Sequence, residues 1–101
     1  MTQVKLCGTS AVPEGELEQF SVGETEVLVV NLGDQFFCLA ARCTHAGAPL
    51  GEGTLIGDML VCPWHGSRFR VSDGAVLKGP AEKPVRVFPN IVKDGYLFIE
   101  L

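Results

Sequence analysis

Residues 43–50 read CTHAGAPL and residues 62–69 read CPWHGSRF, and these two segments decide how the chain is interpreted. The first segment contains Cys43 and His45 as Cys-x-His, and the second contains Cys62 and His65 as Cys-x-x-His. The chain has 2 histidines, and both lie in these segments. Each segment therefore offers one thiolate and one imidazole, which are donors that transition metals prefer. The pattern predicts a metal centre held by side chains from two loops.

The distribution of these donors favours a two-iron cluster over a single zinc ion. Two cysteines and two histidines are a common zinc set, but the usual zinc finger places the cysteines on one arm and the histidines on the other. Here each arm carries one of each. Mixed arms suit a [2Fe–2S] cluster in which both cysteines bind one iron and both histidines bind the other. A zinc-bound structural module remains open as the alternative.

The sequence around the four donors predicts strands. Short β-branched and aromatic runs alternate with turn-forming glycine, aspartate and asparagine, and no stretch keeps a helical period over three turns. The 12 glycines and 6 prolines interrupt the chain too often for long helices. A first strand is predicted at residues 4–7, and hairpins are predicted for 26–31 with 35–41 around Leu32-Gly33-Asp34, 54–56 with 59–62, 68–71 with 75–77, and 85–88 with 96–99. An all-β sandwich or small barrel is expected.

Length and composition narrow the function. A chain of 101 residues has room for one domain, and 47% apolar with 20% charged residues is ordinary for a soluble protein. A formal net charge of -4 argues against nucleic acid as a partner. No apolar run is long enough to span a membrane, and the N-terminus does not read as a signal peptide. We expect a cytoplasmic protein whose Cys7 and Cys38 are reduced, buried side chains without a redox role.

The two segments resemble the cluster-binding boxes of Rieske proteins, and residues 78–81 (KGPA) resemble the proline loop that covers the cluster in that family. The resemblance implies an all-β Rieske fold with three stacked antiparallel sheets in a single domain, residues 1–101. It also implies a cluster-binding subdomain at about residues 42–81, inserted in a basal subdomain of residues 1–41 and 82–101.

The resemblance further implies the roles of the residues in the boxes. One [2Fe–2S] cluster per chain is expected, with Cys43 and Cys62 on the buried iron and His45 and His65 on the outer iron near the surface. The other residues expected at the cluster are Gly47, Trp64, Gly66, Ser67 and Pro80. The glycines would let the backbone approach the cluster, and Trp64 would cover it or fill a gap between the loops. Arg42 and Arg68 flank the site and face either an acidic partner or solvent.

The residues near the ligands predict a ferredoxin of lower potential. High-potential relatives carry an additional cysteine in each box, joined as a disulfide, but Ala48 and Trp64 occupy those positions here. Those relatives also use a serine and a tyrosine to donate hydrogen bonds to cluster sulfur. Ser67 keeps the first donor, whereas Phe69 stands where the tyrosine would be. Rieske potentials run from about −150 to +300 mV, and loss of such donors lowers them.

The expected function is one-electron transfer, not catalysis. Rieske oxygenases add a mononuclear iron held by two histidines and a carboxylate, but both histidines of this chain are assigned to the cluster. We expect a monomeric carrier that passes electrons from an NAD(P)H-dependent flavoprotein ferredoxin reductase to a terminal oxygenase or another acceptor. The small subunit of an assimilatory nitrite reductase is the alternative of the same fold.

Overall fold

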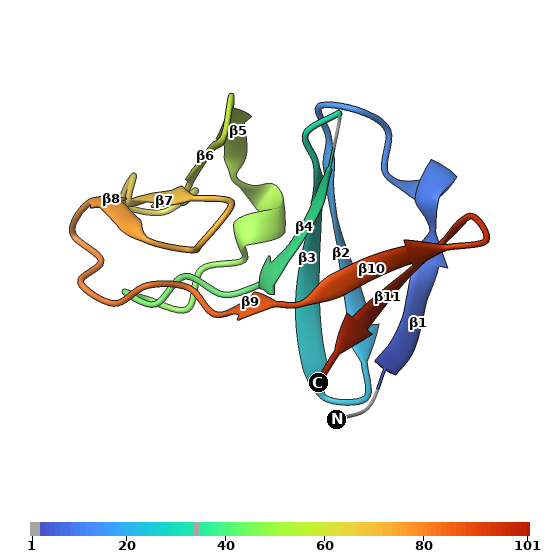
Figure 1. The fold of residues 1–101 in the computed structure, drawn as a ribbon. Coiled ribbons are helices and arrows are strands. Elements are labelled where there is room, and N and C mark those ends of the chain that lie inside the picture. The colour runs from blue at the N-terminus through green and yellow to red at the C-terminus, as the bar shows by residue number, and fades with distance from the viewer. Residues whose placement is uncertain (1–2, 34) are drawn as a thin grey trace.

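The computed structural model describes residues 3–33 and 35–101, and the described part folds into three antiparallel sheets (Figure 1). The first sheet has the order β1 (Gln3–Gly8), β11 (Tyr96–Glu100), β10 (Asn90–Lys93). The second has the order β2 (Leu17–Val22), β3 (Thr25–Asn31), β4 (Phe36–Ala40), β9 (Val87–Phe88). The third has the order β5 (Thr54–Ile56), β6 (Met59–Val61), β7 (Arg68–Arg70), β8 (Val76–Lys78). Two single 3-10 turns, η1 (Thr9–Ala11) and η2 (Leu50–Glu52), complete the described elements.

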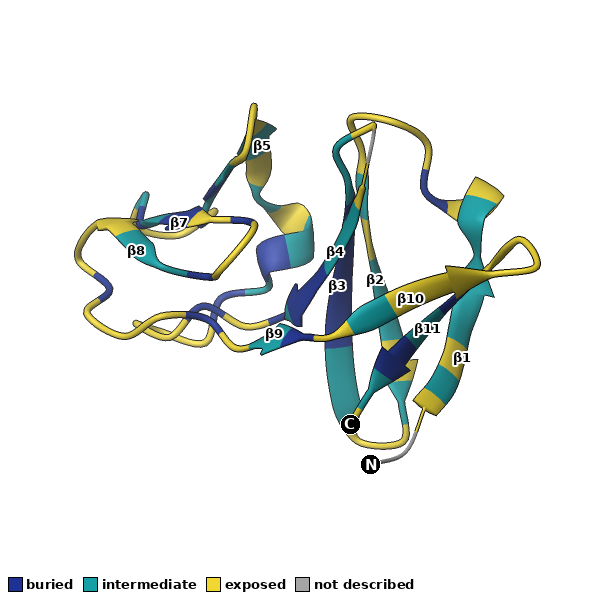
Figure 2. Ribbon diagram, viewed as in Figure 1, coloured by how far each residue is buried: buried dark blue, intermediate teal, exposed yellow. Residues whose placement is uncertain are grey.

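Strand β3 holds the three sheets together because it is buried on both faces, as Figure 2 shows. Val27 and Val29 belong to a core shared with the β1–β11–β10 sheet. Leu28 and Val30 belong to a second core shared with the β5–β8 sheet. Successive side chains of a strand point to opposite faces, so a strand between two cores must be apolar at every position. This explains the unbroken apolar run VLVV at residues 27–30. The prediction of an all-β fold with three antiparallel sheets is confirmed.

Three of the four predicted hairpins are confirmed. Strands β3 and β4 pair with Val29 opposite Cys38, although Asp34 of the predicted turn lies outside the described residues, as do residues 1–2. Strands β5 and β6 pair around Gly57 and Asp58. Strands β7 and β8 pair with a shift in register after the first pair, so that β8 begins one residue later than predicted.

The fourth predicted hairpin is wrong. The segment 85–88 does not pair with 96–99: β9 pairs with β4, and β11 pairs with β10 and β1. Pro89 separates β9 from β10, and a proline cannot donate to a strand ladder, so the chain leaves one sheet there and enters another. Strands β2 and β10 are not among the predicted strands, since residues 90–93 fall between the two segments 85–88 and 96–99 of that hairpin. Strand β10 has only 4 residues, and β2 mixes polar with apolar residues, which weakens the strand signal in the sequence.

The described elements place both ligand segments in loops at the ends of strands. Residues 41–49 connect β4 to η2, residues 62–67 connect β6 to β7, and residues 79–84 follow β8. A search of the described residues for a helix long and apolar enough to cross a membrane finds none.

Candidate metal centre

The two ligand loops are built alike. The Cys43 N–H donates to the Ala48 carbonyl at 2.9 Å, and the Cys62 N–H donates to the Ser67 carbonyl at 2.8 Å, so each loop closes on the residue five positions after its cysteine. Gly47 and Gly66 both stand four residues after the cysteine and have φ values of +71° and +76°. Residues with a side chain rarely adopt this conformation. The glycines predicted at the site are therefore required by the turns themselves.

The two cysteines form the inner half of the site. Cys43 and Cys62 are 3% and 4% exposed and belong to the same apolar core. Burial chiefly raises the pKa of the Cys62 thiol, the Trp64 backbone N–H partly offsets this, and the adjacent Cys43 side chain raises the pKa further. Iron binds the thiolate form, so a metal cation bound to both sulfurs would offset the repulsion between two neighbouring buried negative charges.

The two histidines form the outer half. His45 and His65 are both exposed, and their ring centroids lie 5.2 Å apart with an interplanar angle of 74°. The four donors are thus arranged as a buried sulfur pair and an exposed imidazole pair. Among the described residues, no three Cys, His, Asp or Glu side chains are placed to hold one ion. A two-iron rhomb needs two protein donors at each end, so the arrangement fits a [2Fe–2S] cluster better than a tetrahedral zinc ion.

The segment after β8 is tied to both ligand loops. The Ala81 N–H donates to the Ser67 hydroxyl oxygen at 3.0 Å, and the Thr44 hydroxyl donates to the Lys83 carbonyl at 2.6 Å. The sequence pointed to this segment through residues 78–81, but the contributions of Thr44 and Ala81 were missed. A hydroxyl residue inside each ligand box was the only available signal.

The remaining predicted residues differ in their surroundings. Ser67 is fully buried and is the only buried polar or charged residue in the described part of the chain. Trp64 is 51% exposed, so it does not fill a gap between the loops. Pro80 lines a surface hollow of about 390 Å³ beside His45. The structure therefore places Ser67 in the core, Trp64 at the surface and Pro80 beside His45.

Arg42 is paired within the molecule, although 52% of its side chain stays exposed. Its Nε lies 2.9 Å from Glu26 of β3, and its Nη1 donates to the Gly47 carbonyl at 3.4 Å. The hydrogen bond from Arg42 is the main reason that the pKa of Glu26 is lowered. Gln19 of β2 also donates to Glu26, at 2.7 Å. These contacts connect the first ligand loop to the second sheet.

Comparison with known proteins identifies the family. The pattern of the Rieske [2Fe–2S] domain matches residues 2–89. The chain belongs to the Rieske [2Fe–2S] domain family. The predicted [2Fe–2S] cofactor and Rieske fold are thereby confirmed, and the zinc alternative is set aside.

Proteins similar to this Rieske protein include ferredoxins. Ferredoxin CarAc of Metapseudomonas resinovorans is 37% identical over 97 residues, which cover 95% of this chain and 91% of the relative. The 3-phenylpropionate/cinnamic acid dioxygenase ferredoxin subunit of Escherichia coli (strain K12) is 33% identical over 102 residues, which cover 100% of this chain and 95% of the relative. A chain in the solved complex of reduced oxygenase and oxidized ferredoxin in carbazole 1,9a-dioxygenase has a TM-score of 0.89 and 37% identity, covering 96% of this chain and 91% of that one. The prediction of an electron carrier that is not itself an enzyme is confirmed.

Proposed function

We propose that this Rieske ferredoxin takes one electron at a time from an NAD(P)H-dependent flavoprotein ferredoxin reductase and delivers it to a terminal oxygenase. The observation that carries the proposal is the pair of exposed imidazoles in front of a pair of buried cysteines. An electron can enter and leave through the edge of His45 or His65 without opening the fold. A similar ferredoxin chain has been solved in complex with an oxygenase, which supports an acceptor of that class.

We assign Cys43 and Cys62 to the buried iron and His45 and His65 to the outer iron. The bound cluster supplies one-electron redox chemistry. The chain supplies the rest: the apolar core around the cysteines excludes water on the inner side, and Gly47 and Gly66 hold the turns that aim the ligands. Ser67 connects the second loop to the segment that follows β8, and Pro80 of that segment lies beside His45 of the first loop.

We also propose a division into two subdomains, a cellular compartment and an oligomeric state for this protein. Residues 42–81 would act as the cluster-binding subdomain, and residues 1–41 and 82–101 as the base. The separate β5–β8 sheet supports this division. All four cysteines are free thiols in the structure, which supports a reducing compartment such as the cytoplasm. We propose a monomer, as expected for a small carrier that meets two partners in turn.

Metal analysis with ligand variants tests the assignment. The purified protein should contain about two iron and two acid-labile sulfide per chain. Cys43→Ser, Cys62→Ser, His45→Ala and His65→Ala should each lose the visible spectrum of the cluster. Cys7→Ser and Cys38→Ser are the controls and should keep it. An intact spectrum in either histidine variant would show that the ligands are misassigned.

Reconstitution tests the physiological role. The ferredoxin should couple NAD(P)H oxidation by a flavoprotein reductase to substrate hydroxylation by a terminal oxygenase encoded beside it. Turnover should stop when the ferredoxin is omitted or replaced by His65→Ala. Coupling to a nitrite reductase large subunit, and not to an oxygenase, would overturn the proposed acceptor.

A further inference from the structure

The outer face of the β5–β8 sheet carries a row of side chains at the edge nearest the ligand loops. The register places Thr54, Val61, Arg68 and Lys78 opposite one another across the four strands. The next row turns inward, because Leu60 and Phe69 lie in the core, and side chains alternate along a strand. Val61 directly precedes Cys62, and Lys78 directly precedes the loop at residues 79–84. This row therefore borders the proposed cluster.

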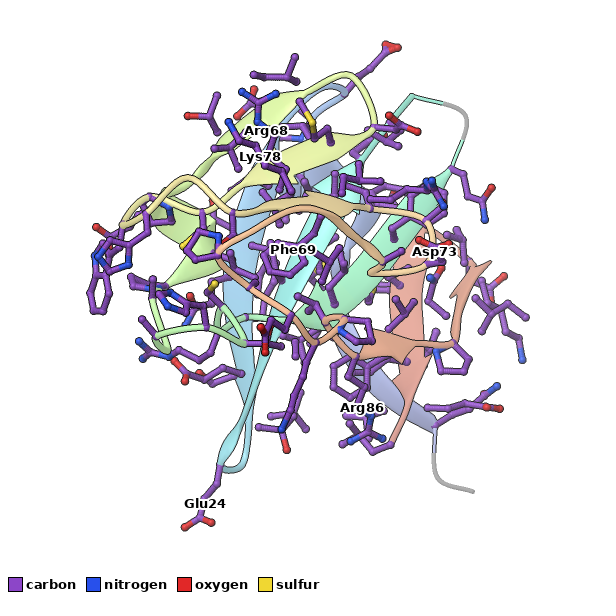
Figure 3. All side chains as sticks on the ribbon, turned by 90° about the vertical axis from the view of Figure 1, so that its left-hand side faces the viewer. Glu24, Arg68, Phe69, Asp73, Lys78 and Arg86 are labelled. Carbon is purple, nitrogen blue, oxygen red and sulfur yellow. The ribbon has the colours of Figure 1, made fainter. Side chains whose placement is uncertain are left out.

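Two cations stand side by side in this row. Arg68 of β7 pairs with Lys78 of β8, and Figure 3 shows their side chains together at one end of the molecule. Within the described residues, the ion pairs join Arg42 to Glu26 and Arg70 to Asp73, and neither includes Arg68 or Lys78. Like charges directly opposite each other on neighbouring strands are destabilising. The fold thus keeps two uncompensated positive charges beside the ligand loops.

A second observation points to a missing acceptor at the same place. The Nε of Arg68 is the only buried side-chain nitrogen or oxygen without a hydrogen-bond partner in the described part of the chain. A buried donor without a partner costs on the order of 1–3 kcal/mol. Arg68 as a whole is half-buried, so part of its side chain lies at the surface although the guanidinium Nε itself is enclosed, and an acceptor from outside would meet the exposed part. A carboxylate matches the geometry of such a planar fork.

We propose that Arg68 and Lys78 form a docking anchor for a carboxylate side chain on an acidic surface of the protein that exchanges electrons with the cluster. This inference rests on the proposed function, since it names the surface chemistry of a redox partner. Charge complementarity supports this proposal. The chain has a net charge of -4, whereas Arg68 and Lys78 place two positive charges next to each other, which favours a negatively charged group on the partner. Arg68 follows His65 by three residues, so a carboxylate held there brings the partner surface to the imidazole edge.

Binding of a defined anionic peptide tests the anchor. Isothermal titration calorimetry of the oxidised, cluster-loaded protein with hexaglutamate at low ionic strength should detect binding that weakens as salt is added. Arg68→Gln and Lys78→Gln should each weaken this binding about fivefold, which corresponds to one partly exposed ion pair. Arg86→Gln and Lys93→Gln are matched controls, because each removes the same charge from another sheet region. Figure 3 places Arg86 at the opposite end of the molecule from Arg68.

The rate of electron transfer to a small anionic acceptor provides a second, kinetic test of the anchor. Ferricyanide, a trivalent anion, accepts one electron from the reduced ferredoxin and becomes ferrocyanide. Its second-order rate should fall in Arg68→Gln and Lys78→Gln, should stay unchanged in the two control variants, and should be inhibited by hexaglutamate. Equal effects of all four substitutions would overturn the anchor, because net charge alone would then explain them.

The two proposals fail in different ways. A wild-type protein whose cluster is present and reducible, but which does not bind hexaglutamate, overturns the anchor and leaves the electron-carrier proposal standing. A purified protein without iron and labile sulfide overturns the carrier proposal whatever it binds. The visible spectrum of each variant shows that a loss of binding is not a loss of the cluster.

Discussion

The buried hydroxyl of Ser67 accepts a hydrogen bond of 3.0 Å from the backbone N–H of Ala81. This bond connects the second ligand loop to the segment after β8, across 14 positions of sequence. A serine hydroxyl has two acceptor lone pairs and one proton, so Ser67 remains able to donate while it accepts from Ala81. One side chain therefore joins two loops and keeps a donor for the cluster that the site is proposed to hold.

Ser67→Ala should lower both stability and reduction potential. The Ala81 N–H would lose its acceptor inside the protein, which costs about 1–3 kcal/mol. Loss of the Ser67 donor would make the reduced, more negative cluster less stable. Thermal unfolding and voltammetry check the two effects, and Ser72→Ala, at an exposed serine, is the control. An unchanged potential would mean that the Ser67 proton does not reach cluster sulfur.

Phe69→Tyr should raise the reduction potential. Phe69 is fully buried in the same core as Cys43 and Cys62, and the tyrosine hydroxyl would add a donor that high-potential relatives possess. Voltammetry at constant pH measures the shift. Phe98→Tyr, in the first sheet, adds the same hydroxyl far from the ligand loops and should leave the potential unchanged. Equal potentials for wild type and Phe69→Tyr would show that this side chain points away from the cysteine sulfurs.

Gly66→Ala should destabilise the second ligand loop. The φ of +76° at Gly66 costs an ordinary residue about 1–2 kcal/mol, even though nothing lies within 4 Å of the added methyl group. The variant should lose its cluster faster at elevated temperature, as followed by visible absorbance. Gly8→Ala is a matched control, because Gly8 has a φ of −71° and also has room for a methyl group. Similar rates of cluster loss in both variants would contradict the argument from backbone strain.

Cys38 should resist alkylation in the native protein. Burial is the main cause that raises the pKa of Cys38 to about 12, and Cys7 adds to it. The thiolate is the reactive form, so iodoacetamide at pH 8 should modify the half-buried Cys7 before Cys38. Peptide mass spectrometry measures the order of modification. Faster labelling at Cys38 would show that its strand opens to solvent.

The same pKa predicts an alkaline loss of stability. The neutral thiol of Cys38 is favoured in the folded state, so its contribution is complete below the unfolded-state pKa of 9.0 and declines as the pH rises toward about 12. The midpoint of thermal unfolding of the wild type should therefore fall above pH 9 more steeply than that of Cys38→Ala. Parallel pH profiles of the two proteins would contradict the assignment to Cys38.

The sequence by itself determined the chemistry of this protein. A Rieske cluster needs two cysteines and two histidines, and the chain supplies Cys43, His45, Cys62 and His65. Their spacing shows that each of two loops carries one cysteine and one histidine. The strands around them could also be predicted, because turn glycines and β-branched runs are local signals. Gly47 and Gly66 were visible for the same reason, since a positive φ is a local demand of the backbone.

The tertiary structure decided what depends on contacts between distant segments. No local sequence pattern encodes these contacts. They include the register that sets Arg68 opposite Lys78, the hydrogen bond from Ala81 to Ser67, and the pairing of β9 with β4. The same holds for Arg42, whose partner Glu26 lies 16 positions earlier in the sequence. Sequence reveals which donors a chain carries, whereas burial and proximity arise only when three sheets pack, because they depend on which distant strands share a core.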